Sequence, residues 1–525
     1  TRFFVGVVLR LQPRPRELVL PGLLEQQPGF RGAFAKMMAS LFTFENVYKA
    51  WLDCRRRKRG KPAALAFEAN AEEELLLLAS ELADRSYRPR PSFCFVARND
   101  KYREVFAAQF RDRVVHHLLV RELEKIWEPI FIHDSYASRK GKGTHAAVSR
   151  LQTFMRRATA NGTRRAWFLQ LDIRSFFPSL DRKLLLDMLL SKLHDEELRW
   201  LVRVVVMHDP TDDPIVACSP DRWQKIPDSK SLFRVLPGKG LPIGNLTSQF
   251  FSNVYLNPLD QYVKHTLKAR HYIRYVDDMI LVHEDRHVLE EWRNAIEAFL
   301  QDWLLLKLHP VRRIIRPVTN GADFLGYIVR PSHLLVRRRT VIRCKKAIEK
   351  YSGKIVHKSI ESTTLHFPPD MYDNLHQTLQ SYFGLFRYGS SGNLCDAVFT
   401  RKPWIELLLE RRGKRLRKRW SNHKKHINLK GQYLFYRRRF RGVIVFQVGC
   451  YYELFDRDAI YAARKFGFRQ IASRSGFYAR CGIHQKNLFY LLRRFTKAKR
   501  RILVVKQTGY LQGNISDRAG SFIML

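Results

Sequence analysis

The sequence predicts a mixed α/β (α+β) chain of several domains, and three observations carry this prediction. The chain has 525 residues, which at roughly 150 residues per domain corresponds to about three or four domains. Hydrophobic residues make up 45% and aromatic residues 12%, enough to form packed cores and too much for a disordered polycation. Amphipathic stretches with helical spacing alternate with short apolar runs rich in β-forming residues.

The local patterns predict the elements in chain order. Residues 1–40 form a poorly specified N-terminal extension, and because Met37–Met38 precedes the first patterned segment, we expect 1–36 to lie upstream of the biological start. An apolar run at 166–173 predicts a strand, and two carboxylates within 272–282 predict a hairpin tip. A loop of small and basic residues is expected over 134–145, and helices are expected over 41–88, 110–127, 286–308 and 337–400.

The charge of the chain predicts the kind of partner that it binds. There are 94 Lys and Arg against 49 Asp and Glu, a formal net charge of +45, so a polyanion is the expected partner. Nucleic acid is favoured over an anionic membrane surface, and no apolar run approaches the roughly 20 residues that span a bilayer.

The seven cysteines form no CxxC pair, which argues against disulfides or structural zinc and favours the cytoplasm.

The sharpest chemical signal is the pair of adjacent carboxylates in Tyr275-Val276-Asp277-Asp278. Two neighbouring carboxylates repel each other unless a cation compensates, and a pair of divalent ions can clamp both oxygens of a phosphoryl displacement. Asp172, near the end of its own apolar run, is the natural third carboxylate, and oxygen ligands with phosphate chemistry indicate Mg²⁺. The alternative is that Asp277 and Asp278 form only a solvated turn.

An ordered set of motifs resembles the reverse transcriptases over residues 44–399. The set comprises FRDRVVHH at 110–117, DSYASRKGKGTH at 134–145, LDIRSFF at 171–177, LPIGNLTSQ at 241–249, YVDD at 275–278, LHP at 308–310 and FLGY at 324–327. The resemblance implies a right-hand polymerase with fingers, palm and a helical thumb. It also implies attack of a primer 3′-hydroxyl on the α-phosphate of a deoxynucleotide, catalysed mainly by positioning and electrostatics.

The same resemblance assigns roles to individual residues. Asp172, Asp277 and Asp278 are the expected catalytic residues, and with Ile173 they are the expected ligands of two Mg²⁺ ions, with Mn²⁺ as an alternative. Phe177 matches the aromatic gate against a ribose 2′-hydroxyl, although a core aromatic is the other interpretation. The expected contacts to nucleotide and template are Arg139, Lys140, Lys142, Phe177, Ile243, Gly244, Ser248, Gln249 and Arg312. For Arg139, Lys140 and Lys142, a solvated basic loop is the alternative.

The loop at 241–249 suggests a subtype. Most reverse transcriptases carry Gln-Gly and Ser-Pro where this chain has Ile243-Gly244 and Ser248-Gln249, and the pattern resembles diversity-generating retroelement enzymes, which copy template adenine with errors. Ile243 removes an amide near the nascent pair, so looser selection is expected. At 309–312 the chain has Arg312 where relatives carry a lysine, which puts that lysine's proton-donating role in doubt.

Residues 443–512 carry a second resemblance, to the N-terminal mismatch-reading domain of MutS proteins. Its Phe-x-Glu motif reads Tyr451-Tyr452-Glu453 here. The resemblance implies that the Tyr451 ring stacks on a mispaired base and that Glu453 forms a hydrogen bond with this base. The alternative is that Tyr451 and Tyr452 are ordinary strand residues. Between 411 and 441 lie 14 Lys and Arg and no Asp or Glu. The aromatic residues interleaved there favour contact with nucleic acid, namely Trp420, Tyr433, Phe435, Tyr436 and Phe440.

The expected organisation therefore has five parts: an extension over 1–40, fingers and palm over 41–335, thumb over 336–410, basic linker over 411–441 and MutS-like domain over 442–525. The expected function is RNA-directed DNA synthesis in a diversity-generating retroelement. An intron maturase-like or defence-associated enzyme and a non-catalytic RNA-binding scaffold are the rivals. The expected partners are template RNA, primer, cDNA and deoxynucleotides, with an accessory nucleic-acid-binding protein left open and no membrane.

Overall fold

The computed structural model describes residues 40–98, 102–358, 363–389, 392–400, 402–412, 415–420, 428–471, 476–511 and 515–524. The expected extension over 1–40 lies outside these ranges except for its last residue. The described chain combines helices and strands, so the expected α/β (α+β) class is confirmed. It divides into two compact units, one within 40–143, 169–281 and 287–315 and one within 144–168, 282–286 and 316–524.

The first unit begins with helices packed around α5 (Phe110–Trp127), whose apolar side chains at helical spacing are buried along its length. Thr43 caps the first of these helices by accepting a hydrogen bond from the Asn46 amide. An antiparallel hairpin follows, with Phe93 opposite Ala107, and a short strand joins its edge in parallel. These elements are α2 (Phe44–Arg55), α3 (Pro62–Ala69), α4 (Ala71–Ala83), β1 (Phe93–Arg98), β2 (Tyr102–Ala107) and β4 (Ile215–Val216).

A four-stranded sheet in the order β5-β6-β3-β7 holds the residues of the expected catalytic site. Its strands are β5 (His271–Tyr275), β6 (Asp278–His283), β3 (Trp167–Ile173) and β7 (Leu308–Pro317). In β3, Leu169, Leu171 and Ile173 are buried, whereas Gln170 and Asp172 alternate with them and stay partly exposed. The expected strand at 166–173 and hairpin at 272–282 are thus confirmed.

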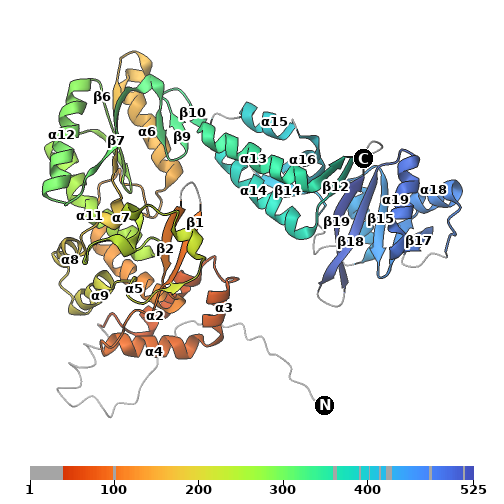
Figure 1. Cartoon of the computed structure of the whole chain (residues 1–525), viewed down its shortest axis with the longest axis horizontal. Coiled ribbons are helices and arrows are strands. Elements are labelled where there is room, and N and C mark those ends of the chain that lie inside the picture. The colour runs from red at the N-terminus through yellow and green to blue at the C-terminus, as the bar shows by residue number, and fades with distance from the viewer. Residues whose placement is uncertain are drawn as a thin grey trace, which may run out of the picture. The chain divides into compact units, whose positions relative to one another are not determined.

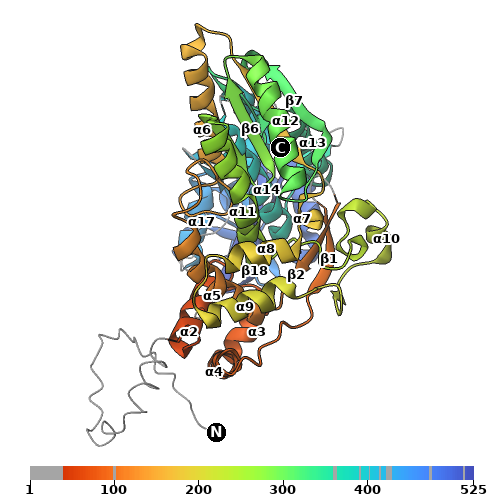
Figure 2. The same ribbon diagram turned by 90° about the vertical axis from the view of Figure 1, so that its left-hand side faces the viewer.

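One helix of the first unit lies beside this sheet, and further helices complete the unit. The long helix α12 (Arg286–Asp302) runs beside β6 and β7 (Figure 1), and Arg313 of β7 pairs with Glu297 of α12 at 2.8 Å. Figure 2 shows α8 and α9 side by side. The remaining elements are α7 (Phe176–Ser179), α8 (Arg182–Leu190), α9 (Glu196–Met207), α10 (Pro220–Trp223), η2 (Asp228–Lys230), η3 (Leu232–Arg234), α11 (Leu246–Gln261) and η4 (Tyr262–Thr266).

The second unit contains the expected helices of 337–400 and an unexpected pair of strands among them. The hairpin β11 (Val356–Lys358) and β12 (Thr363–His366) separates α13 from α14. The other elements before residue 420 are α6 (Thr144–Ala158), η1 (Ala160–Gly162), η5 (Val318–Asn320), β8 (Ala322–Phe324), β9 (Tyr327–Val329), β10 (Leu334–Val336), α13 (Arg338–Ile355), α14 (Pro369–Tyr388), α15 (Gly392–Thr400), α16 (Pro403–Leu408), β13 (Leu409–Arg412) and β14 (Arg415–Lys418).

The C-terminal part of this unit is built on a seven-stranded sheet in the order β11-β12-β19-β18-β15-β16-β17. Thr364, Leu365 and His366 of β12 pair antiparallel with β19, so the hairpin inside the helical segment extends the tail's sheet. Figure 1 shows β15, β18 and β19 side by side. The elements are α17 (Leu429–Arg437), β15 (Val443–Val448), β16 (Tyr451–Phe455), α18 (Arg457–Phe466), β17 (Arg480–His484), η6 (Gln485–Asn487), α19 (Leu488–Lys497), β18 (Ile502–Leu511) and β19 (Ile515–Met524).

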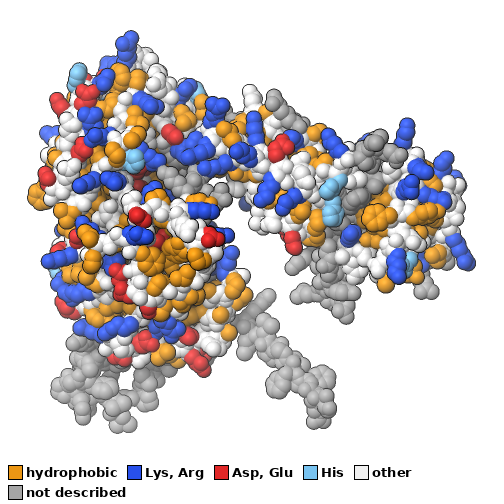
Figure 3. Space-filling view, viewed as in Figure 1, with side chains coloured by type: hydrophobic (Ala, Val, Ile, Leu, Met, Phe, Trp, Pro, Cys, Tyr) orange, Lys and Arg blue, Asp and Glu red, His pale blue; other side chains and the backbone are white. Residues whose placement is uncertain are grey.

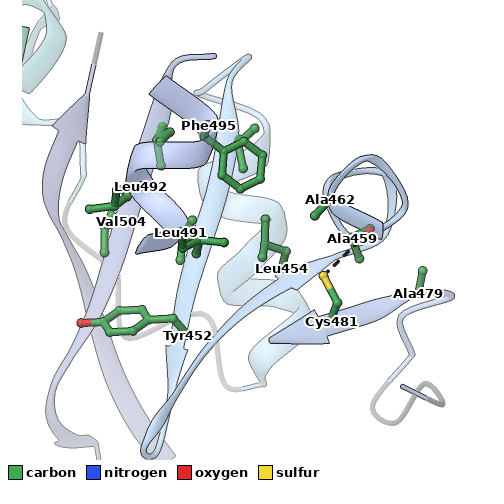
Figure 4. Close-up of a cluster of buried hydrophobic side chains, with 13 residues drawn as sticks. Tyr452, Leu454, Ala459, Ala462, Ala479, Cys481, Leu491, Leu492, Phe495 and Val504 are labelled. Carbon is green, nitrogen blue, oxygen red and sulfur yellow. Dashed lines mark hydrogen bonds between the residues drawn. The ribbon is translucent and has the colours of Figure 1, made fainter. Parts of the chain in front are cut away.

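One face of this sheet packs on α18 and α19 through a buried apolar cluster (Figure 4). Leu454 and Val504 from the strands meet Ala459 of α18 and Phe495 of α19, and all four side chains are fully buried. The Cys481 thiol lies 3.8 Å from the Ala459 carbonyl oxygen, the dashed line in Figure 4. The other face carries Phe446 and Phe455, whose rings contact Tyr433 of α17.

The expected nucleic-acid contact of the aromatics in 411–441 is wrong. Trp420, Tyr433, Phe435, Tyr436 and Phe440 are each no more than 6% exposed. Their rings form a core between α17, the sheet and the preceding hairpin, and the Trp420 indole donates to the Leu407 carbonyl. Burying an aromatic ring in a core stabilises the fold, and this packing takes precedence over the composition that suggested a nucleic-acid surface.

Candidate functional site

The turn between β5 and β6 carries the expected catalytic pair. Val276 adopts a left-handed backbone conformation with φ 56°, which is strained for a β-branched residue. Asp277 and Asp278 follow it directly and are partly buried. A strained turn persists only where surrounding contacts hold it. The residues that contact this turn are therefore part of the candidate site.

Arg274 holds the turn from beneath. Its guanidinium is fully buried and donates to the Val276 carbonyl at 3.0 Å. The same side chain contacts the buried Asp260 carboxylate through Nε at 2.8 and 3.0 Å and through Nη2 at 2.5 Å. Tyr272 donates to Asp260 at 2.8 Å. This satisfied polar group ties α11 to the turn that carries Asp277 and Asp278.

The beginning of the basic loop 134–145 is attached to the same group. The Arg274 amide donates to the Asp134 carbonyl and the Tyr136 amide donates to the Arg274 carbonyl, both at 3.0 Å. Asn253 of α11 accepts from Arg274 Nη1 at 3.2 Å and donates to the Ala137 carbonyl at 2.9 Å. The loop therefore has a fixed starting point next to the carboxylate turn.

The structure brings Asp172 and Asp277 together. Burial, followed by the negative charge of Asp172, raises the pKa of Asp277 to about 6, and the two carboxyl groups are within hydrogen-bonding reach. Two carboxylates this close disfavour full ionisation unless a cation joins them. The pair therefore matches the expected cation site chemically, because oxygen donors that repel each other are relieved by a divalent ion.

Asp278 and Asp172 also have protein partners. Gln170 donates to Asp278 at 3.2 Å, and Arg312 Nη1 lies 2.7 Å from Asp172 Oδ2. Among the described residues no three carboxylate, histidine or cysteine side chains are grouped closely enough to form a metal-binding cluster. The structure thus pairs two of the three expected carboxylates and gives Asp278 a different neighbour. The Ile173 side chain is buried and apolar, so only its main-chain carbonyl could ligate a metal.

The loop at 241–249 is docked on β2. The Ile243 carbonyl accepts from the Phe106 amide at 2.9 Å, and Asn245 accepts from the Ala108 amide at 3.2 Å. Gly244 has φ +126°, and a Cβ there would lie 2.9 Å from the Phe106 carbonyl oxygen, so a side chain is excluded. Ser248 is buried, and Gln249 is exposed and accepts from Ser138 at 3.1 Å.

Phe177 differs from its neighbour Phe176 in exposure. Phe176 is buried in the core, whereas Phe177 is partly exposed and meets the Phe176 ring edge-on at 5.3 Å. The Phe177 carbonyl accepts from the Leu241 amide at 2.9 Å. This bond places the expected gate beside the expected template loop.

The three basic residues expected at the triphosphate already have protein partners. Arg139 is mostly buried, lies 2.9 Å from Glu128, and donates to the Ile132 and Ser135 carbonyls. Lys140 lies 2.5 Å from Glu124, and Lys142 donates to the His133 carbonyl at 2.7 Å. In this structure the three side chains stabilise the loop, and Arg139 in particular has a structural position.

A different basic residue, Arg103 of β2, acts on Asp277 through its charge. Its charge lowers the pKa of Asp277 against the larger effects of burial and Asp172, and its side chain is exposed. Sequence reasoning missed Arg103. Alternation with the buried Glu104 and Phe106 marks a half-buried strand, but no local pattern indicates that this strand faces Asp277.

The expected mismatch-reading residues of the tail lie on β16. Tyr451 is 52% exposed and meets the His484 ring edge-on at 5.7 Å. Glu453, on the same face of the strand, has a side chain only 13% exposed and lies 3.6 Å from Arg480. Tyr452 points into the opposite core. Tyr451 therefore offers a ring to a ligand, whereas Glu453 is turned towards a cation of the protein.

Comparison with known families identifies both parts. A family model described as reverse transcriptase (RNA-dependent DNA polymerase) matches residues 91–329. The chain contains a reverse transcriptase domain. The expected class of enzyme, an RNA-directed DNA polymerase, is confirmed at the level of this family. The model of MutS domain I matches residues 429–518, so that match begins with α17, before the expected boundary at 442.

Two curated relatives are similar to part of this chain. Protein YkfC of Escherichia coli (strain K12) is 25% identical over 307 residues, covering 52% of this chain and 74% of that protein. The group II intron-encoded protein LtrA of Lactococcus lactis subsp. cremoris is 22% identical over 358 residues, covering 56% of this chain. The match spans only 54% of LtrA. Among solved structures, apo telomerase from Candida tropicalis matches 56% of this chain and 52% of its own chain, at 9% identity and a TM-score of 0.35.

Proposed function

We propose that the chain is an RNA-directed DNA polymerase that extends a primer by two-metal phosphoryl transfer. The observation that carries the proposal is the pairing of Asp172 and Asp277 at a strained turn inside a reverse transcriptase domain. Its substrates would be template RNA, a primer and deoxynucleotides, with cDNA as the product. Burial, followed by the charge of Asp172, raises the pKa of Asp277, and a non-catalytic scaffold has no use for two carboxyl groups held together in this way, so this alternative is disfavoured.

The ligands proposed for the metal ions are Asp172, the Ile173 carbonyl, Asp277 and Asp278. Mg²⁺ is proposed because all of these are oxygen donors, with Mn²⁺ as the alternative. Bound there, the ions would neutralise charge that develops on the reacting phosphate. Arg312 occupies one oxygen of Asp172, so it competes with a cation for that oxygen.

The other residues are proposed to position the incoming nucleotide. Arg103 is assigned to the triphosphate ahead of Arg139, Lys140 and Lys142, because its side chain is exposed and its charge lowers the pKa of Asp277. Phe177 is assigned as the gate against the 2′-hydroxyl because it is more exposed than Phe176. Gly244, Ser248 and Gln249 are assigned to the template side of the docked loop.

The retroelement type remains a separate proposal. Ile243 lacks the amide that would bond near the nascent pair, which supports error-prone copying in a diversity-generating retroelement. An intron-encoded enzyme is the second candidate, favoured by the similarity to LtrA. Ile243→Gln should lower misincorporation opposite template adenine, which sequencing of cDNA products would measure; an unchanged error spectrum would remove the support for error-prone copying.

For the tail we propose binding to mismatched duplex. The partly exposed ring of Tyr451 supports this role, since stacking on a base contributes roughly 1–3 kcal/mol. Tyr451→Ala should reduce the preference of the full chain for mismatched over paired duplex, and His484→Ala tests whether its supporting ring matters. Equal affinity of the parent protein for both duplexes would reduce the tail to a basic anchor.

We also propose the domain boundaries and the cellular location of the protein. Fingers and palm occupy 41–335, the thumb 336–410, and the MutS-like domain the tail, now beginning with α17 because the family match begins at 429. An accessory nucleic-acid-binding protein is left open. We propose a cytoplasmic location because all seven cysteines are free, five of them buried. No described helix is both long and apolar enough to cross a bilayer.

The central test uses purified protein with a DNA primer on an RNA template. The parent protein should extend the primer only with a divalent ion, and Asp172→Asn should abolish extension. Asp187→Asn is the matched control, because Asp187 is exposed on α8 and the chemical change is identical. Extension by Asp172→Asn at the parent rate would remove the catalytic assignment.

A further inference from the structure

A cleft of about 360 Å³ lies just beyond the catalytic strand, at the end of β3 that carries Asp172. It is formed by the turn at Arg174–Ser175, the segment 228–239 and the residues before β7, all within the first unit. This volume is within the range of small-molecule sites, roughly 300–1,000 Å³. None of the residues assigned above to metal, nucleotide or template lines it.

The cleft concentrates positive charge. Four of its lining residues are basic and one is acidic, namely Arg174, Arg234, Lys239, Lys307 and Asp228. Asp228 lies 3.8 Å from Arg234, so these two charges offset each other. Arg174, Lys239 and Lys307 have no carboxylate partner among the residues that the structure describes. Like charges gathered in a concave surface create a field that draws in an anion. Figure 3 shows that Lys and Arg also outnumber acidic side chains over the visible surface, but the cleft is concave as well as basic.

The walls of the cleft are fixed before any ligand arrives. The buried Glu104 of β2 accepts from the Ser231 hydroxyl at 2.7 Å and the Leu232 amide at 2.6 Å, which anchors the 228–239 segment to the β1–β2 hairpin. At the other end of that segment, the buried Arg182 donates to the Gly240 carbonyl at 2.8 Å. The opposite wall is joined by the Arg174 amide, which donates to the Lys307 carbonyl at 2.9 Å. A preorganised site loses less entropy on binding.

Two strained residues line the cleft from opposite turns. Ser175 has φ 47° and Leu305 has φ 54°, the left-handed region that non-glycine residues rarely adopt. Strain of this kind is stored preferentially at ligand sites. Leu305 is 51% exposed and its neighbour in the cleft, Leu236, is 71% exposed. The cleft thus offers cations together with an uncovered apolar surface.

We propose that this cleft binds a small polyphosphate, with its phosphate oxygens at Arg174, Lys239 and Lys307 and its remaining atoms against Leu236 and Leu305. The proposal deepens the proposed polymerase function, on which it rests for the source of the ligand, because nucleoside triphosphates and released pyrophosphate are the polyphosphates such an enzyme meets. A free polyphosphate is favoured over a nucleic-acid strand because the charge converges on a compact cleft, whereas strand-binding surfaces track the backbone as an extended groove.

The test is calorimetric titration of the full chain with inorganic pyrophosphate, and separately with ATP, in EDTA and without nucleic acid. Without a divalent ion the Asp172–Asp277 pair repels phosphate, so binding there does not contribute. We expect saturable binding of at least one probe, weakened by about tenfold or more in Lys239→Glu/Lys307→Glu. Lys192→Glu, at an exposed lysine outside the cleft, should bind like the parent. Lys307→Gln gives a milder change if the double variant folds poorly.

The outcomes separate the sources and the two proposals. Tighter binding of ATP than of pyrophosphate would assign the apolar wall to a nucleoside, and equal binding would assign the cleft to phosphate alone; both support the site. The site would be overturned if neither probe bound, or if the cleft variants and the control variant bound with equal affinity. It would also be overturned if the cleft variants lost affinity for an RNA oligonucleotide but not for pyrophosphate or ATP. A protein that binds pyrophosphate but extends no primer would contradict the polymerase function and leave the cleft intact.

Discussion

The ion pair beneath the turn that carries Asp277 and Asp278 should stabilise this turn only while both partners are present. Asp260 and Arg274 are both 0% exposed and share three contacts of 2.5–3.0 Å. Asp260→Asn keeps the shape of the side chain but leaves the Arg274 guanidinium buried without its counter-charge, a loss of about 3–5 kcal/mol. The pair Arg313–Glu297 is partly exposed, so Glu297→Gln should remove only about 0–1 kcal/mol.

The assay is hydrogen exchange of the segment 271–283, because local opening free energies can be measured there even when a multidomain chain unfolds in several steps. Protection should fall strongly in Asp260→Asn and hardly at all in Glu297→Gln. The double variant Asp260→Leu/Arg274→Leu should lose less protection than the single variants Asp260→Leu and Arg274→Leu lose together. The reason is that the double variant leaves neither charge buried without a partner. Equal losses in Asp260→Asn and Glu297→Gln would refute the idea that this buried pair supports the turn.

Three further outcomes are expected. The pKa of Asp277 is raised from 3.8 to about 6, so the folded state holds a proton that the unfolded state releases. The metal-free protein should therefore lose stability as pH rises through about 6. In thermal melts with EDTA, Asp277→Asn should have a higher melting temperature than the parent at pH 7 but not at pH 4. Trp420→Ala should lose about 3–5 kcal/mol by deleting a buried ring, while Arg417→Ala, at an exposed position of β14, stays within about 0.5 kcal/mol in the same denaturant titration. Arg312→Gln should lower the Mg²⁺ concentration for half-maximal extension by up to about fivefold, because an exposed pair contributes about 0–1 kcal/mol; an unchanged requirement would argue against competition for Asp172.

Short apolar runs and ordered motifs correctly predicted the strands that carry Asp172, Asp277 and Asp278. The run ending at Asp172 and the hairpin around Asp277 are local patterns, and alternation alone fixes which side chains share a face. The ordering of the motifs also predicted the family that the match over 91–329 identifies. Local patterns could not predict the neighbour of each carboxylate, because Arg312 and Gln170 contact Asp172 and Asp278 from neighbouring strands of the sheet. The charge of Arg103, which lowers the pKa of Asp277, comes from β2.

The tail shows where composition misleads. A stretch with 14 basic residues and several rings suggested a linker on nucleic acid, yet the rings pack inward while those of its arginines and lysines that the structure describes stay partly or fully exposed. Charged side chains can keep their heads in water while aromatics on the same helix are buried. The pairing of β12 with β19 joins segments more than 140 residues apart in sequence, and no local signal specifies such a long-range register.

The most direct measurement of the central claim compares primer extension and RNA affinity in Asp277→Asn. The claim is that Asp277 serves chemistry, whereas affinity for the phosphate backbone comes from the surrounding Lys and Arg. Asp277→Asn should therefore lose primer extension by about a hundredfold or more while its RNA affinity stays within about twofold of the parent. Asp302→Asn, at an exposed residue at the end of α12, should match the parent in both assays. Extension by Asp277→Asn at the parent rate, or an equal loss in Asp302→Asn, would contradict the assignment of this turn as the catalytic centre.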